Sequence, residues 1–236
     1  MRKYFELLYK KSVEDFYKDV ENNLKKKKKT FIVTANPETF SFGKKDKEID
    51  KILLDKENVI VPDGVAIVAV AKMHGFKVKE RITGIDLANK LLVLCNENGY
   101  KLALLGAKQE VLEALENKIK NNYQNIKLVK TKNGYEEGKD KFFEELVKLE
   151  PDVCLVALGI PAQEKLIYKH LNKFKKGIFV GVGGSFDVMS GAKKRAPKFF
   201  QKTYTEWLYR ITTEPKRIGR FFKSNVTFMF KTLILK

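Results

Sequence analysis

Two charged residues, Asp63 and Arg81, are the strongest candidates for chemistry in the sequence. Asp63 directly follows a mostly apolar stretch that ends at Pro62. A carboxylate at the end of a strand can take a proton from a hydroxyl group as a general base, whereas its commoner role would be to cap a helix starting near Val65. The planar guanidinium of Arg81 can pair with an acid at the surface or hold phosphate or carboxylate oxygens. The residues alone leave both alternatives open at each position.

Glycines and small polar residues gather in three further segments, each just after a predicted strand. Glycine allows a backbone to come close to a ligand. The segments are Thr34-Ala-Asn36-Pro37-Glu38, Gly159-Ile-Pro161-Ala-Gln163-Glu164 and Gly181-Val-Gly183-Gly184-Ser-Phe-Asp187. The last one is similar to a dinucleotide-binding turn, but Phe186 stands where that turn needs its third glycine. The sequence therefore argues against an NAD site, and it contains no P-loop.

These residues must be positioned by a fold in which short apolar runs alternate with amphipathic stretches up to about residue 190. That alternation predicts an α/β, Rossmann-like domain with a largely parallel sheet flanked by helices. The expected strands are 30–34, 58–61, 101–105, 126–129, 153–158 and 178–181, and the expected helices include 86–98, 109–122, 139–149 and 162–172. Ser12-Val-Glu-Asp15 predicts a capping box that opens an earlier helix. Ligands of such sheets bind outside the carboxyl ends of the strands, which is where the candidate residues lie.

The composition points to a globular protein with an anionic partner. The chain has 236 residues and a formal net charge of +18, which favours nucleic acid, an anionic membrane or phosphorylated substrates as partners. Cys95 and Cys154 lie in apolar surroundings and are expected to be reduced core residues, as suits a cytoplasmic protein. With two histidines and no cysteine pair at ligand spacing, we expect no structural metal site.

The charge is concentrated at the end of the chain, so we divide it into a catalytic α/β domain at 1–192 and a basic helical appendage at 193–236. The appendage holds twelve Lys or Arg, two acids and nine aromatic residues. Pro197 and Pro215 suit the first turns of two helices. Such a segment is typical of an interfacial membrane element, and the alternative is a helix pair packed on the core. The same charge also permits an alternative function, that of a nucleic-acid-binding α/β protein.

Taken together in their order and spacing, the strand-end motifs resemble the WecG/TagA/CpsF family of glycosyltransferases, from about residue 30 to 220. Besides the three segments above, the resemblance rests on motifs in both parts of the chain. They are Pro62-Asp63-Gly64, Glu80-Arg81-Ile-Thr83-Gly84, Lys194-Arg195-Ala196-Pro197, Glu206-Trp207-Leu-Tyr-Arg210 and Glu214-Pro215-Lys-Arg217-Ile-Gly-Arg220.

The resemblance implies a role for each matching position. It implies that Asp63 is the general base and that Arg81 belongs to the catalytic pocket. Thr34, Asn36 and Gln163 would bind the sugars, and Tyr135, Gly184 and Asp187 would bind the substrate near the nucleotide. Arg210, Arg217 and Arg220 would belong to an appendage that docks on the membrane, closes over the site and stabilises the leaving group.

The resemblance also implies the reaction. The enzyme would move N-acetylmannosamine or a related sugar from a UDP donor onto a sugar linked to undecaprenyl diphosphate, with inversion, in teichoic acid-type synthesis. It would need no metal cofactor, with which the lack of an Asp-x-Asp pair at a strand end agrees. The protein would act at the cytoplasmic face of the bacterial inner membrane as a peripheral protein, without nucleic acid, and either alone or as a homo-oligomer.

Overall fold

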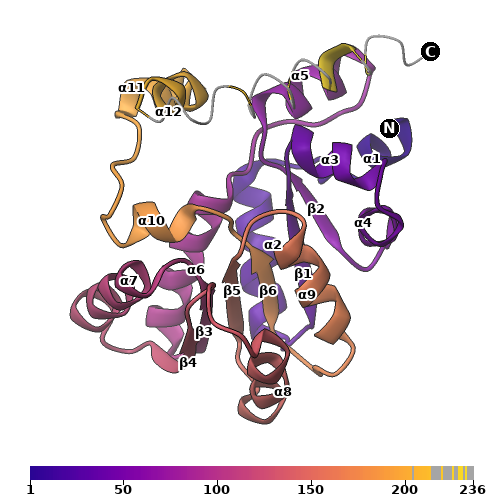
Figure 1. Ribbon diagram of the computed structural model, residues 1–236. Helices are drawn as coiled ribbons and strands as arrows, with labels where there is room; N and C mark the ends of the chain where they lie inside the picture. The colour runs from indigo at the N-terminus through magenta and orange to yellow at the C-terminus, as the bar shows by residue number, and fades with distance from the viewer. Residues whose placement is uncertain (204, 214–218, 220–224, 226–227, 231, 233–236) are drawn as a thin grey trace.

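The computed structural model describes residues 1–203, 205–213, 219, 225, 228–230 and 232. In this part of the chain, six strands form one sheet in the order β2-β1-β6-β5-β3-β4, and all neighbouring strands are parallel (Figure 1). The strands are β1 (Thr30–Ala35), β2 (Val59–Pro62), β3 (Lys101–Gly106), β4 (Lys127–Lys132), β5 (Val153–Ala157) and β6 (Ile178–Gly181). The α/β, Rossmann-like fold predicted from the sequence is confirmed.

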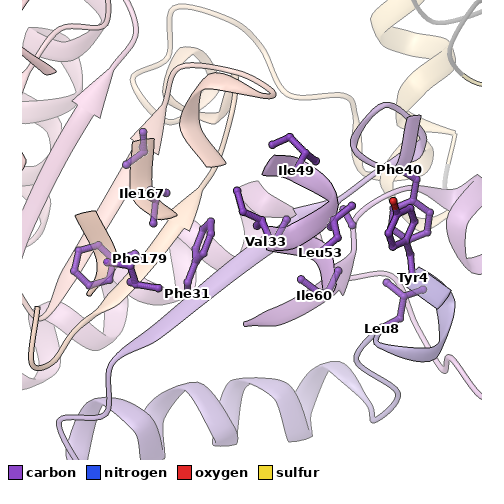
Figure 2. Close-up of a cluster of buried hydrophobic side chains, with 14 of the residues drawn as sticks. Tyr4, Leu8, Phe31, Val33, Phe40, Ile49, Leu53, Ile60, Ile167 and Phe179 are labelled. Carbon is purple, nitrogen blue, oxygen red and sulfur yellow. The ribbon is translucent and has the colours of Figure 1, made fainter. Parts of the chain in front are cut away.

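Helices cover both faces of the sheet and give it two hydrophobic cores. Successive side chains of a strand point to opposite faces, so Phe31 and Val33 of β1 belong to one core and Ile32 to the other. Figure 2 shows the first core, in which Phe31 and Val33 share a cluster with Ile49 and Leu53. It lies under α1 (Arg2–Glu6), α3 (Pro37–Gly43), α4 (Lys47–Leu54), α5 (Val65–Met73), α8 (Lys139–Leu149) and α9 (Ala162–Leu171). The second lies under α2 (Val13–Lys25), α6 (Gly84–Asn98), α7 (Gln109–Asn122) and α10 (Ser185–Met189).

Local sequence signals set several of these boundaries. The Ser12 side chain accepts from the backbone N–H of Asp15, and the Asp15 side chain accepts from the backbone N–H of Ser12. The predicted capping box at the start of α2 is therefore confirmed. The C-cap of α6 is Gly99 in the left-handed conformation that favours glycine. Cys95 and Cys154 are buried and unpaired with each other, as expected of core residues.

The connections leaving β1 and β6 diverge to opposite faces of the sheet, and we call the region outside these two strand ends the crevice. After β1 the chain enters α3, whose Phe40 packs in the first core, whereas after β6 it enters α10, whose Phe186 packs in the second. A point where adjacent connections turn to opposite faces is where α/β sheets bind ligands. The fold thus directs attention to the residues that come directly after β1, β2, β5 and β6.

The chain after α10 runs to α11 (Lys198–Lys202) and α12 (Glu206–Thr213), which stand apart from the sheet (Figure 1). Pro197 is the N-cap of α11, one position before the predicted first turn, and Pro215 lies outside the described residues. Farther along, Phe228 is buried against Phe5 and Phe40. The described residues of the appendage therefore touch the core, while the domain boundary at 192 stays a prediction. No helix in the described ranges is long and apolar enough to span a membrane.

Candidate functional site

Asp63 lies where β2 ends and faces the first turn of a helix that begins much later in the chain. Its backbone N–H donates to the carbonyl oxygen of Ala35 over 2.8 Å, which ties it to the end of β1. Its Oδ2 accepts from the backbone N–H of Gly84, the first residue of α6, over 3.3 Å. The N-cap of α5 is Gly64, without a side-chain hydrogen bond, so the alternative that Asp63 caps the helix near Val65 is wrong. A carboxylate at the positive end of α6 is favourably placed, and about a quarter of it is exposed.

Arg81 packs directly against Asp63. Its Nε donates to the backbone carbonyl oxygen of Asp63 over 3.0 Å and lies 3.8 Å from Asp63 Oδ1. Its Nη2 donates to Oε2 of Glu206 over 2.9 Å, and the Arg81 side chain is only 13% exposed. Arg81 therefore pairs with acids, as one alternative expected, but these pairs are largely shielded from water rather than at the surface. Its contact with oxygens of a ligand stays a prediction.

Thr34 and Asp63 converge on one point of the crevice. The Thr34 hydroxyl donates to the carbonyl oxygen of Gly181 over 2.9 Å and so joins the ends of β1 and β6. A Cβ placed on Gly84 would lie 3.6 Å from both Thr34 Oγ1 and Asp63 Oδ2. Asn36 caps α3, with its Oδ1 accepting from the backbone N–H groups of Glu38 and Thr39. The structure thus gathers Thr34, Asn36 and Asp63 at adjacent strand ends, and sugar contacts for them stay predictions.

Gln163 holds together the loops that come after β5 and β6. Its Oε1 accepts from the backbone N–H groups of Gly159, over 3.1 Å, and Gly183, over 3.0 Å. Its Nε2 donates to Oε1 of Glu164 over 2.8 Å, and the side chain is buried. A Cβ on Gly181 would come within 2.5 Å of Gln163 Nε2, so this glycine makes room for the amide. Gln163 thus stabilises the two loops beside the crevice, and its contact with a sugar stays a prediction.

Glu164 is a buried acid to which the sequence alone assigned no role. Among the residues that the structure describes, its Oε2 has no hydrogen-bond partner, although the side chain is buried. Burial raises the pKa of Glu164 to about 7, and the hydrogen bond from Gln163 opposes that effect while the charge of Glu38 adds to it. Near neutral pH this carboxyl group is therefore partly protonated.

The remaining predicted site residues come from α10, from the loop after β4 and from the appendage. Gly184 is the N-cap of α10, and Asp187 on α10 lies 3.8 Å from the ammonium group of Lys193. Tyr135 is 77% exposed in the loop after β4, and the strand order puts β4 and β2 at opposite edges of the sheet. Tyr135 and Asp63 are therefore not brought together. Arg210 belongs to α12, but its side chain, like the whole of Arg217 and Arg220, lies outside the described residues.

Three further residues extend the site from Arg81 toward α6 through the appendage. Arg195 donates to both carboxylate oxygens of Asp86, over 2.6 and 3.0 Å, and to Oε1 of Glu206 over 3.3 Å. Burial opposes ionisation of Asp86, but the bonds from Arg195 and Thr83 outweigh it and lower the pKa of Asp86. The tail motifs contain Arg195 and Glu206, yet nothing in the sequence showed that they pair with each other across eleven positions.

The described residues contain no group of three or more His, Cys, Asp or Glu side chains arranged to hold a metal ion. The prediction that the reaction needs no metal stays a prediction, because it concerns the reaction and not only the protein.

Comparison with known proteins relates this geometry to a family. A model of the glycosyl transferase WecG/TagA/CpsF family matches residues 4–236. A Bacillus subtilis (strain 168) protein named N-acetylglucosaminyldiphosphoundecaprenol N-acetyl-beta-D-mannosaminyltransferase is 35% identical over 189 residues, 80% of this chain and 73% of the relative. A protein of the same name from Staphylococcus aureus (strain NCTC 8325 / PS 47) is 39% identical over 202 residues, 85% of this chain and 78% of the relative. These matches give no support to the nucleic-acid-binding alternative. The chain belongs to the WecG/TagA/CpsF family of glycosyl transferases.

Proposed function

We propose that this protein transfers N-acetylmannosamine, or a closely related sugar, from UDP to N-acetylglucosamine on undecaprenyl diphosphate in teichoic acid-type synthesis. The names of the two relatives support the acceptor and the sugar. The observation that carries the proposal is the convergence of Asp63, Thr34 and Arg81 at the crevice of a chain that belongs to a glycosyltransferase family.

In the proposed reaction Asp63 is the general base. It accepts the proton of the acceptor hydroxyl while that oxygen forms a bond to the anomeric carbon of the donor. The bond from that carbon to the UDP oxygen breaks on the opposite face, so the configuration inverts and UDP leaves with added negative charge. Arginines stabilise such charge when they are held in place before the reaction. Arg210, Arg217 and Arg220 are our candidates for this role, without a metal ion.

The test is incubation of the protein with a panel of UDP-sugars and a synthetic lipid diphosphate acceptor, with and without EDTA, read by mass spectrometry. We expect transfer from UDP-N-acetylmannosamine, unaffected by EDTA. Because a general base contributes about 10²- to 10⁴-fold, Asp63→Asn should lose about that factor in kcat and still bind the donor. Asp19→Asn on α2 removes a carboxylate outside the site and serves as the matched control.

Each result bears on a different part of the proposal. Near-normal turnover by Asp63→Asn would remove this residue from the mechanism. Absence of transfer from every UDP-sugar by the unaltered protein would overturn the function itself. Loss of transfer in the presence of EDTA would refute the metal-independent mechanism.

We also propose that the protein works as a peripheral protein on the inner face of the cell membrane. Large apolar side chains are exposed on the described part of the appendage, with Phe199 69% and Phe230 65% accessible. They occur in a segment with ten more basic than acidic residues. Exposed aromatic residues among cations favour insertion into an anionic lipid surface, where the proposed lipid-linked acceptor would be found.

A further inference from the structure

A continuous series of alternating charges connects the crevice with the appendage. Asp63 Oδ1 lies 3.8 Å from Arg81, and Arg81 donates to Oε2 of Glu206 over 2.9 Å. The other oxygen of Glu206 accepts from Arg195, which also donates two hydrogen bonds to Asp86. Asp63, Arg81 and Asp86 belong to the α/β domain, whereas Arg195 and Glu206 come from the predicted appendage. Glu206, the first residue of α12, is thus the acid through which α12 reaches Arg81.

Glu206, in the middle of this series, is buried, and the two arginines beside it are partly shielded from water. The side chain of Glu206 is 5% exposed, with Arg81 at 13% and Arg195 at 24%. Charges shielded from water interact more strongly than charges at the surface, and a buried cation that loses its partner is strongly driven to find another. The direction in which Arg81 points therefore depends on Glu206.

That direction affects Asp63. Arg81 uses its Nε for the backbone carbonyl oxygen of Asp63 and turns Nη2 to Glu206. The Asp63 carboxylate, already within ion-pair range of Arg81, is the acid that Arg81 would engage fully if Glu206 were neutral. A carboxylate held directly by a guanidinium fork is more stable as an anion and a weaker base.

We propose that Glu206 is a positioning residue that draws Arg81 away from the Asp63 carboxylate, so that Asp63 stays basic only when α12 is in place. The inference rests on the proposed function, in which Asp63 takes the proton of the acceptor. Glu206 acts through Arg81 and touches no reacting atom. Arg195 supports it by holding the second oxygen of Glu206 between α6 and α12.

The simpler view is that Glu206 only fastens α12 to the domain. The two views predict different behaviour once Arg81 has been removed. A fastening residue would still reduce turnover once Arg81 is replaced. Its second contact, with Arg195, which is held by Asp86, would remain in Arg81→Gln and would be lost in the double variant. A residue that acts through Arg81 would have no further effect once Arg81 is replaced, since nothing remains to be drawn from Asp63.

The kinetic experiment compares Glu206→Gln, Arg81→Gln and the double variant in the full chain, with Thr212→Ala on the exposed side of α12 as the control. Glu206→Gln should lower kcat by about tenfold or more, a part of the 10²- to 10⁴-fold that a general base supplies. The acid limb of its pH–rate profile should move to lower pH, because Asp63 becomes a weaker base. The double variant should be no slower than Arg81→Gln, and Thr212→Ala should match the unaltered protein.

A second measurement needs no substrate and separates this inference from the proposed function. The Asp63 carboxyl is titrated by ¹³C NMR in the unaltered protein and in Glu206→Gln, with its signal assigned by loss in Asp63→Asn. The midpoint should fall in Glu206→Gln. It should fall less in Asp86→Asn, where Arg195 turns more fully to Glu206 and weakens the hold on Arg81.

An unchanged titration midpoint of Asp63 in Glu206→Gln would overturn the inference. So would a double variant whose reduction in kcat is the product of the reductions in the two single variants. If the unaltered protein transfers no sugar yet the midpoint shifts as expected, the proposed function fails and the coupling between Glu206 and Asp63 stands. Should Glu206→Gln not fold, Asp86→Asn gives the same test from the other end of the series.

Discussion

Replacing Glu164 by glutamine should make the protein more stable at alkaline pH and leave it almost unchanged in acid. In the folded protein, burial raises the pKa of Glu164 to about 7, against 4.5 for an exposed glutamate. A protonated Glu164 and a glutamine have nearly the same shape, and both offer an oxygen to the amide of Gln163, which donates to Glu164 Oε1. The substitution therefore removes the ionisation and keeps the hydrogen bond.

The sign and size of the effect come from proton linkage. The folded state binds the Glu164 proton more tightly than the unfolded state. The stabilising contribution of this proton to the free energy of unfolding is therefore fully present below pH 4.5 and is lost as the pH rises toward about 7. Each pH unit within that window changes the free energy of unfolding by about 1.4 kcal/mol. The unaltered protein should therefore lose about 3 kcal/mol relative to Glu164→Gln between pH 4.5 and 8.

The assay is urea unfolding of the unaltered protein and of Glu164→Gln at pH 5, 6, 7 and 8. The difference in the free energy of unfolding should grow through this series and level off above pH 7. Glu97→Gln, which neutralises an exposed glutamate on α6, is the matched control and should give a difference that hardly changes with pH. A constant difference for Glu164→Gln would refute the reasoning, since it would mean that Glu164 ionises as easily in the fold as in water.

Two other predictions concern the packing of Gly181 against Gln163 and the appendage. Gly181→Ala would place a Cβ 2.5 Å from the buried amide of Gln163 and should cost about 1–3 kcal/mol of stability, measured by urea unfolding; unchanged stability would show that the amide can move aside. The full chain should cosediment with vesicles containing anionic lipid at low salt and separate from them as salt rises. Phe199→Ser with Phe230→Ser should weaken this binding, and equal binding to zwitterionic vesicles would contradict the charge argument.

The fold could be predicted from the sequence because its signals are local. Alternating side chains place β1 residues in two cores, and the predicted strand at 30–34 differs from β1 by one residue. The order of the strands was beyond the reach of these signals. Which strand lies beside β1 depends on how helices cover the two faces, and it is this order that places Asp63 beside Thr34 and far from Tyr135.

The site was only partly predictable for the same reason. The end of a strand can be recognised in the sequence, so Asp63 and Gln163 were found, but their partners come from distant positions. Gln163 joins Gly159 to Gly183, and Arg81 meets Glu206, 125 positions later. Pairings across such separations leave no periodic pattern. The count of charges correctly described the appendage as basic, but it could not show that one of its two acids, Glu206, is a described residue that pairs with Arg81.

The site has two parts, one held by hydrogen bonds to backbone groups and one held by contacts between charged side chains. Thr34 and Gln163 fix the ends of β1, β5 and β6 through bonds to backbone groups, so changes there should act first on stability. Arg81 and Glu206 instead join two parts of the chain through side-chain charges alone at their contact, and substitution there should act on turnover before it acts on folding. An enzyme that must wait for a lipid-bound acceptor gains from this division, because its crevice can stay rigid while the strength of its base depends on the segment that would meet the membrane.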